Sequence, residues 1–215
     1  MEYTAVIVAA GVGKRTLLDY NKVFFEIEEG MTILDSCLSV FLKDNECKQI
    51  VLVCAKDEIE YMNQQYGHLS VMTLCVGGST RQESVFCGLK QTKYPYVFIH
   101  DGARPYLKDC SLQVLKKTLE SEDACLLVVP MVDTPKVVKD GYVQTTLERS
   151  TIYRAQTPQC FKTKLILHCH QLAKDQGFQA TDDAQLAEYF ADKPVKMVLG
   201  DEENVKITLP KDLVR

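Results

Sequence analysis

The stretch that decides the fold is YTAVIVA (residues 3–9), an apolar run that passes directly into the loop AAGVGKRTLLDYNK (residues 9–22). The run predicts a buried β-strand, because it is β-rich and apolar along most of its length. The loop combines two glycines with three cations: Gly11, Gly13, Lys14, Arg15 and Lys22. Because glycines leave backbone N–H groups unobstructed, this strand and loop together predict a binding site for a phosphate group.

The loop matches neither of the two common phosphate-loop patterns. A Walker loop has Gly, four residues, and then Gly-Lys followed by Ser or Thr. A dinucleotide fingerprint has a third glycine where this chain has Thr16. A tight turn with solvated cations therefore remains the alternative interpretation of the loop taken alone.

The chain of 215 residues suffices for one substantial hydrophobic core, and we expect a single domain over 1–215. Its net charge of −4 argues against a general nucleic-acid binder, since such proteins usually carry a basic face. No apolar run approaches the roughly 20 residues of a membrane-spanning helix. The N-terminus also lacks the residue order of a signal peptide. We therefore expect a cytoplasmic protein with no membrane partner.

The nine cysteines include no CxxC pair, and most of them lie in apolar or amphipathic runs. They are expected to be reduced, buried thiols. His168 and His170 lie on either side of Cys169 in a segment with helical spacing, which directs the two imidazoles to different faces of a helix. The sequence therefore predicts no metal site at this cluster.

Short β-rich runs alternate with segments of helical spacing along the chain. The expected strands are 3–9, 48–55, 70–76, 96–101, 123–130 and 195–200, with a last strand in 204–215 that leads into a helix start at Pro210. The expected helices are 31–44, 56–66, 80–91, 110–121, 162–177 and 181–192. This order predicts an α/β fold with a mainly parallel sheet and helices on both faces. In such folds ligands bind beyond the carboxyl ends of the strands.

Residues 131–157 interrupt this alternation with two β-like stretches on either side of KDGY (139–142). Asp-Gly is a strong hairpin signal, so we predict a protruding antiparallel arm. An isolated hairpin is marginal in water and an unpaired strand edge is a liability. The arm must therefore pack on its own domain or on a second copy of the chain, and the second copy is favoured.

A second glycine pair occurs in GGSTRQES (77–84), after a predicted strand. Flexible backbone and the hydroxyls of Thr80 and Ser84 suit contacts to a base or a ribose. Alternatively, the segment is a helix N-terminus in which Ser79 caps the helix and Gln82 completes a capping box. The two interpretations are compatible.

The segment HDGARPY (100–106) places Asp101 at the carboxyl end of a predicted strand. A carboxylate in this position can hold a magnesium ion that bridges phosphates. The alternative is a capped strand end without a ligand. Arg104 is expected to form a structural ion pair with its neighbour rather than a substrate contact.

Eight sequence elements occur in one order: AAGxGxR, NK, GGSTRQES, HDGARP, DTPK, an arginine before AQTPQ, TDDA and NVKIT. With this order and spacing, the chain resembles the 2-C-methyl-D-erythritol 4-phosphate cytidylyltransferases over nearly its whole length. The resemblance implies a Rossmann-like nucleotidyltransferase fold with a β-arm that forms a homodimer. It also implies that CTP and methylerythritol phosphate react to give 4-diphosphocytidyl-2-C-methyl-D-erythritol and pyrophosphate, in non-mevalonate isoprenoid biosynthesis.

The resemblance also implies roles for individual residues around CTP. Arg15 and Lys22 match catalytic cations that stabilise charge on the α-phosphorus and on the leaving pyrophosphate. The other matching positions contact the triphosphate, cytosine or ribose: Ala9, Ala10, Gly11, Gly13, Gly78, Ser79 and Ser84. Asp101 matches a position that serves Mg²⁺, as a divalent cation, and the hydroxyls of the substrate.

On the side of the sugar phosphate, the matching positions are Thr134, Arg149, Thr157 and Lys206. Lys206 counts as catalytic, because the matching lysine lies close to the reacting phosphates. In the family, the arginine that matches Arg149 is delivered by the arm to the site of the neighbouring subunit. The predicted partners are therefore small-molecule substrates and a second copy of the chain.

Three other functions are compatible with parts of these patterns. A ribitol-5-phosphate cytidylyltransferase, which makes CDP-ribitol for teichoic acid synthesis, shares the loop, the TPQ stretch and the final lysine. DTPK (133–136) and TDDA (181–184) favour the isoprenoid enzyme over it. A nucleotide-binding regulator with a dead site would have lost Arg15, Lys22, Asp101 or Lys206, and all are present. A glycosyltransferase would usually carry an Asp-x-Asp motif, which does not occur here.

Overall fold

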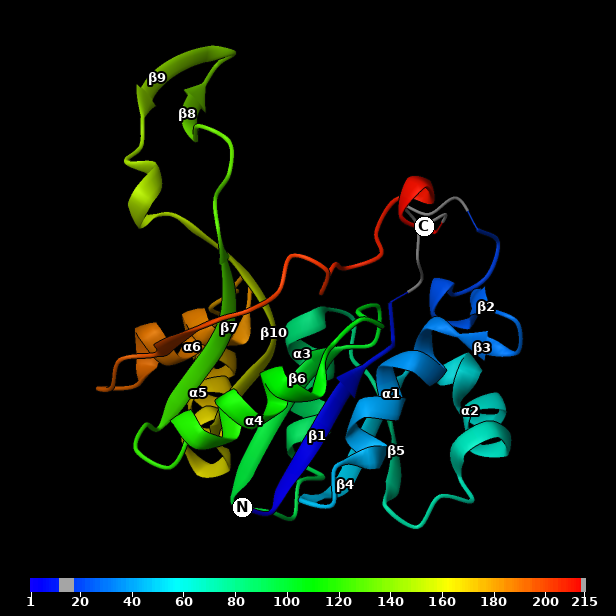
Figure 1. Cartoon of the computed structure of the whole chain (residues 1–215). Helices are drawn as coiled ribbons and strands as arrows, with labels where there is room; N and C mark the ends of the chain where they lie inside the picture. The colour runs from blue at the N-terminus through cyan, green and yellow to red at the C-terminus, as the bar shows by residue number, and fades with distance from the viewer. Residues whose placement is uncertain (12–17, 214–215) are drawn as a thin grey trace.

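The computed structural model describes residues 1–11 and 18–213, and a seven-stranded sheet forms its centre (Figure 1). The strand order is β11-β7-β10-β6-β1-β4-β5. Their bounds are β1 (Tyr3–Val8), β4 (Cys47–Cys54), β5 (Met72–Val76), β6 (Tyr96–Asp101), β7 (Ala124–Pro130), β10 (Tyr153–Lys162) and β11 (Lys196–Leu199). Only β10 is antiparallel to its neighbours, β6 and β7. The predicted mainly parallel sheet is confirmed.

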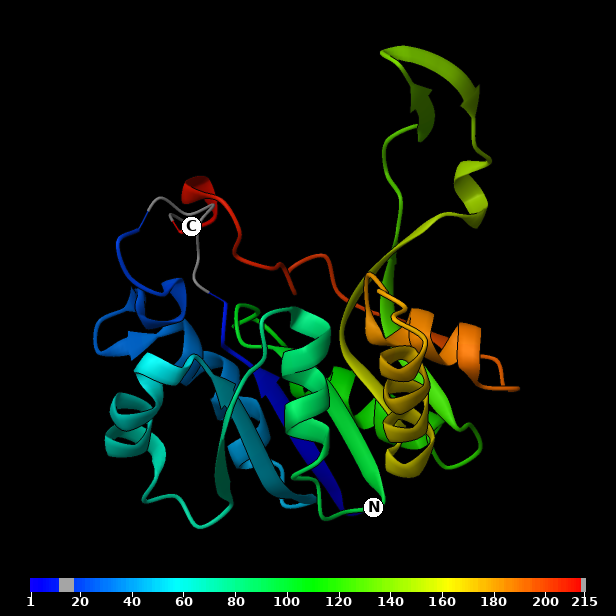
Figure 2. The same cartoon turned by 180° about the vertical axis from the view of Figure 1, so that it is seen from behind.

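Six α-helices in the described part of the chain cover both faces of the sheet: α1 (Ile33–Lys43), α2 (Ile59–Tyr66), α3 (Arg81–Leu89), α4 (Asp109–Thr118), α5 (Thr163–Asp175) and α6 (Asp183–Phe190). Ala5 and Ile7 of β1 pack in one core cluster with α1, α2 and α4. Val6, between them, packs in the other with α3, α5 and α6. Figures 1 and 2 show the two layers from opposite sides. Burial on both faces explains why the strands are apolar along their length.

β10 is a strand that the sequence patterns do not predict, and its first five residues fall within the expected arm 131–157. It contains Pro158, and the register against β7 shifts between Ala155 and Gln159. Because proline cannot donate a ladder hydrogen bond, it argues against a central strand. The irregular register accommodates it, and β10 inserts between the two parallel halves of the sheet.

The prediction of a last strand within 204–215 is wrong. Residues 204–208 form no strand, and Ile207 N donates to Ala103 O at 2.9 Å instead of joining the sheet. This segment, drawn from orange to red in Figure 1, crosses the carboxyl ends of the strands rather than running alongside them. A short 3-10 helix, η4 (Pro210–Asp212), follows with Pro210 in its first turn, as expected.

The arm projects away from the sheet between β7 and β10 (Figure 1). It consists of β8 (Lys136–Lys139) and β9 (Tyr142–Thr146), joined by Asp140 and Gly141 with φ of 51° and 81°. Positive φ at both positions is the condition for the type I′ turn that Asp-Gly predicts. The hairpin is therefore confirmed, and every residue of its two strands is exposed.

The remaining expectations concern the cysteines, the histidine cluster and membrane insertion. All nine cysteines are unpaired, and six are buried. His170 is buried and His168 is exposed, so α5 directs them to different faces as predicted. Within residues 1–11 and 18–213, every helix is too short or too polar to span a lipid bilayer.

Candidate active site

A cavity of about 500 Å³ opens where β1 and β6 end, at the carboxyl edge of the sheet. Its lining includes these residues predicted to hold CTP: Ala9, Ala10, Gly11, Gly78, Ser79 and Ser84. Lys22, Asp101 and Lys206 line the same cavity. The structure thus brings together side chains that are distant in sequence. Gly13, Lys14 and Arg15 lie outside the described residues.

Lys22 reaches the cavity because Asn21 ties the end of the first loop to the end of β1. Asn21 is buried; its side-chain amide donates to Ala9 O at 2.9 Å and accepts from Val23 N at 3.3 Å. It thereby caps η1 (Lys22–Phe24), the 3-10 helix that begins with Lys22. The positioning role of Asn21 was missed from sequence, although asparagine directly before a helical turn is a capping signal.

The second glycine loop is held against the start of α3. Thr80, not Ser79, is the N-cap of this helix, and Glu83, not Gln82, completes the capping box. The Glu83 carboxylate accepts from both Ser79 N at 2.7 Å and Thr80 N at 3.3 Å, which places the cap one residue later than expected. A Cβ on Gly78 would lie 2.3 Å from Glu83 Cβ, so the close approach requires glycine.

Asp101 is the buried carboxylate at the end of β6, and three cations surround it. Its Oδ1 accepts from Arg81 Nε at 3.2 Å, and its Oδ2 lies 2.9 Å from Lys206 Nζ and 3.7 Å from Arg104 Nε. Burial raises the pKa of Asp101, but Arg81, Lys206 and Arg104 together hold it below its ordinary value. Arg104 also donates to Asn204 O at 2.7 Å, which fits its expected structural role.

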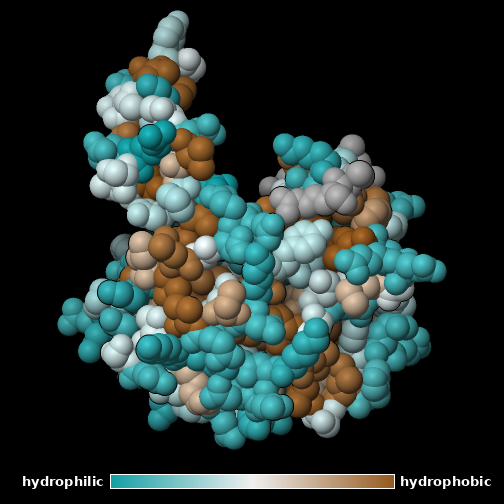
Figure 3. Space-filling model, viewed as in Figure 1, coloured by the Kyte–Doolittle hydropathy of each residue, from teal (hydrophilic) through white to brown (hydrophobic). Residues whose placement is uncertain are grey.

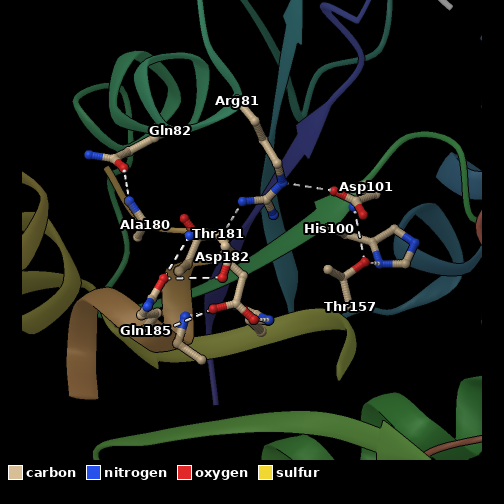
Figure 4. A network of polar contacts seen from close by, with 12 residues as sticks. Arg81, Gln82, His100, Asp101, Thr157, Ala180, Thr181, Asp182 and Gln185 are labelled. Carbon is tan, nitrogen blue, oxygen red and sulfur yellow. Dashed lines mark hydrogen bonds and ion pairs between the residues drawn. The ribbon is translucent and has the colours of Figure 1, made fainter. Parts of the chain in front are cut away.

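Thr157 is connected to Asp101 through a buried hydrogen-bonded chain (Figure 4). Its hydroxyl accepts from Asp101 N at 3.1 Å and lies 3.0 Å from His100 Nδ1. The other imidazole nitrogen, Nε2, lies 3.1 Å from Arg104 O, a pure acceptor, and therefore carries the proton. Nδ1 then accepts from the Thr157 hydroxyl. This neutral tautomer fixes the start of the turn that carries Asp101.

We expect stability to depend on pH through His100. Burial lowers the pKa of His100 from 6.5 to about 4, although Arg104 O opposes the shift. The unfolded chain therefore binds a proton in this window that the folded chain does not. The free energy of unfolding should fall by about 3 kcal/mol as the pH drops from about 6.5 to about 4. Urea unfolding between pH 4 and pH 7 measures this slope. In His100→Gln the slope should be smaller, and an unchanged slope would contradict the assignment.

A second cavity, of about 240 Å³, lies on the other side of Asp101. Its lining includes Thr157 and Arg104, and it shares Arg81, Asp101 and Lys206 with the larger cavity. These three side chains therefore form a wall between two adjoining spaces. An enzyme that joins two substrates needs two binding spaces that meet at the reacting groups.

Thr134 and Arg149 are not brought to either cavity. They line a separate hollow at the base of the arm, together with Val132 and Tyr153. Arg149 Nη1 donates to Val132 O at 2.9 Å within its own arm. In a single chain these two predicted substrate residues are thus apart from Asp101 and Lys206.

The cavity offers little for a resident metal ion. The described residues contain no group of three or more His, Cys, Asp or Glu side chains that could bind a metal by themselves. Asp101 is the only carboxylate among the described residues that line the larger cavity, and both its oxygens contact cations. Mg²⁺ is commonly held by one or two carboxylates together with substrate phosphates and water. The residues present would therefore hold Mg²⁺ only as an ion that enters with a triphosphate, with Asp101 as the carboxylate that could contact it.

Over nearly its whole length, the chain matches one family of nucleotidyltransferases. The model of the 2-C-methyl-D-erythritol 4-phosphate cytidylyltransferase family matches residues 3–215. Enzymes of that name from Bacillus licheniformis and Clostridium kluyveri are 38% and 43% identical, over 100% and 98% of this chain and 94% and 93% of theirs. The chain belongs to this family of CTP-dependent enzymes. These matches do not favour the ribitol-phosphate alternative.

Solved structures agree with the fold. The 4-diphosphocytidyl-2C-methyl-D-erythritol synthase of Anaerococcus prevotii superposes with a TM-score of 0.86 at 31% identity, over 99% of this chain and 94% of that one. The 2-C-methyl-D-erythritol 4-phosphate cytidylyltransferase of Francisella tularensis gives 0.85 at 29% identity, over 99% and 97%. The predicted nucleotidyltransferase fold is therefore confirmed.

Proposed function

We propose that the chain transfers the cytidylyl group of CTP to 2-C-methyl-D-erythritol 4-phosphate, with release of pyrophosphate, in the cytoplasm. The observation that carries this proposal is the larger cavity, where Lys22, Asp101 and Lys206 meet the backbone of two glycine-containing loops. Backbone N–H groups and cations suit a triphosphate. Full-length membership of the family supports the choice of both substrates.

In the proposed reaction, an oxygen of the sugar phosphate attacks the α-phosphorus of CTP in line with the leaving pyrophosphate. The protein forms no bond to the reacting groups; it positions two anions and offsets their charge. Lys22 and Arg15 stabilise charge on the α-phosphorus and on pyrophosphate. Lys206, which lines both cavities, keeps its contact with Asp101 and donates a second N–H to the incoming phosphate.

CTP is proposed to bind along the carboxyl edge of β1, with its phosphates at Gly11, Gly13 and the cations. Ala9, Ala10, Gly78 and Ser79 would approach cytosine and ribose with backbone atoms. Ser84 supports this loop, since its Oγ accepts from Gly78 N at 3.1 Å and donates to Thr80 O at 2.8 Å. The shape of the loop is therefore set before the nucleotide arrives.

The sugar phosphate is proposed to bind in the smaller cavity, beside Thr157, Asp101 and Lys206. Thr134 and Arg149, which lie at the base of the arm, would act on the site of a second copy in a homodimer. The arm supports this proposal, because Tyr142 and Val143 are 76% and 62% exposed at its tip. Figure 3 shows apolar residues on the face of the protruding arm that this view presents, where no other part of the described chain covers them. Exposed apolar surface of this kind is typical of an interface.

We expect the reaction to require a divalent cation. Mg²⁺ bound to the triphosphate, with Asp101 as its protein ligand, would offset phosphate charge. Excess EDTA should therefore abolish pyrophosphate release, and added Mg²⁺ should restore it. Full turnover in excess EDTA would contradict this requirement.

A pyrophosphate-release assay with two acceptors tests the proposed substrate. CTP is supplied with either methylerythritol phosphate or ribitol 5-phosphate, and kcat/KM is compared. We expect methylerythritol phosphate to be turned over faster. Faster turnover of ribitol 5-phosphate would replace the proposed acceptor with the alternative one.

A further inference from the structure

Arg81, the first residue of α3, bridges two carboxylates that belong to different elements. Its Nε donates to Asp101 Oδ1 at 3.2 Å, and its Nη1 donates to Asp183 Oδ2 at 2.9 Å. Figure 4 shows the contact with Asp101. The guanidinium is therefore hydrogen-bonded to two carboxylates at once, and its planar fork fixes the direction of both contacts.

Asp183 is the more deeply buried of the two carboxylates, with 1% of its side chain exposed. It is the first residue of α6, and its Oδ1 accepts from His170 Nε2 of α5 at 3.1 Å. Burial raises the pKa of Asp183, but Arg81 and His170 hold it below its ordinary value, so the carboxylate is charged. A buried charge is costly without a partner. Asp183 therefore anchors Arg81 to the two helices α5 and α6.

The anchored Arg81 determines which oxygen of Asp101 faces the reaction. Oδ1 is held by Arg81, which leaves Oδ2 for Lys206 at 2.9 Å. Arg81, Asp101 and Lys206 are also the side chains that line both cavities. A displacement of Arg81 would thus be passed on to Lys206 at the boundary between the two substrates.

We propose that Asp183 and Arg81 are positioning residues for cytidylyl transfer, which hold Asp101 and, through it, Lys206. This inference rests on the proposed function. Without the charge of Asp183, the guanidinium of Arg81 is free to turn both its donors onto Asp101, because a bidentate pair is the stronger arrangement. Arg81 then competes with Lys206 for Oδ2. Small displacements of a positioned group cost large factors in rate.

Asp183→Asn tests this role, because the amide oxygen can still accept hydrogen bonds but carries no charge. We expect kcat to fall by about tenfold or more, with the KM for CTP changed by less than about twofold. The wild type, measured in the same assay, reports separately on the proposed function. If the wild type does not transfer the cytidylyl group, the proposed function and this inference are both wrong.

A matched control exists at the opposite edge of the sheet. Asp44 is a largely buried carboxylate, with 9% of its side chain exposed, that pairs with buried Lys116 at 2.9 Å before β4 begins. Asp44→Asn should lower the melting temperature without changing kcat. If Asp44→Asn lowers kcat as much as Asp183→Asn, the loss reflects stability alone and the inference is wrong.

A double-mutant cycle separates positioning from any independent role. If Asp183 acts through Asp101, adding Asp183→Asn to Asp101→Asn should lower kcat no further than Asp101→Asn alone. If the losses of kcat in the two single variants multiply in the double variant, the inference is wrong. It is also wrong if Asp183→Asn alone keeps the wild-type kcat. Arg81→Lys provides a second route if Asp183→Asn does not fold. Lysine keeps the positive charge but lacks the planar fork that bridges both carboxylates. Arg81→Lys should therefore lower kcat as Asp183→Asn does, and it too should lower kcat no further when combined with Asp101→Asn.

Discussion

Lys22→Ala is expected to lower turnover at saturating CTP and sugar phosphate by about two orders of magnitude or more. The lost contact acts on charge that develops in the transition state, and such contacts typically contribute about 3 kcal/mol. Lys22 lines the larger cavity beside the backbone of Ala9 and Gly11, where the triphosphate is proposed to lie. Arg15→Ala is expected to have the same effect. Both variants should keep wild-type circular dichroism, and Lys22 is not part of either hydrophobic core cluster.

Lys48→Ala is a suitable control for Lys22→Ala. Lys48 is an exposed lysine of β4 near the opposite edge of the sheet, so its loss removes the same charge far from the site. Its kcat should equal that of the wild type. Wild-type kcat in Lys22→Ala or Arg15→Ala would mean that the first loop does not stabilise the transferred phosphate.

Mixing two inactive chains is expected to restore activity if the arm completes the site of a partner. An Arg149→Ala chain and a Lys22→Ala chain would exchange to form heterodimers in which one site carries both lesions and the other carries neither. Each heterodimer should then have about half the wild-type turnover, by the reciprocity of a two-fold interface. The separation of Arg149 from the cavities within one chain motivates this expectation.

The matched control for this mixture is Lys22→Ala with Lys206→Ala. Both lysines line the cavity of their own chain, so every site of a heterodimer carries one lesion and mixing should restore nothing. Subunit exchange is verified beforehand with two differently tagged chains. No recovery in the Arg149 mixture, despite verified exchange, would show that Arg149 serves its own subunit or no site at all.

The regular part of the fold could be predicted because its hydrophobic pattern is local. β6 was predicted with the bounds that it has, since 96–101 is apolar and ends at a polar turn. β10 was not predicted because it contains Pro158, and a proline within a short apolar run argues against a central strand. The segment around Ile207 has the composition of a strand, yet it crosses the sheet edge, and composition does not distinguish these two paths.

From sequence, the residues of the site could be predicted only where the type of side chain itself indicates a role. Glycines, hydroxyls and cations after predicted strands indicated part of the lining of the larger cavity, including Gly78 and Lys22, whereas only the family resemblance indicated Lys206. The contact between Arg81 and Asp183 joins residues 102 positions apart, and it depends on the packing of α6 beside α5. Asp183 belongs to the TDDA motif, but the motif alone does not show which residue its carboxylate contacts.

Phosphorus NMR of a reaction with CTP and methylerythritol phosphate tests the central claim most directly. The proposed transfer predicts that a new diphosphate ester and pyrophosphate appear in equal amounts, and only when the sugar phosphate is present. Pyrophosphate release that does not depend on the acceptor would indicate hydrolysis of CTP instead. That result, or a diphosphate product formed only with ribitol 5-phosphate, would contradict the proposed function.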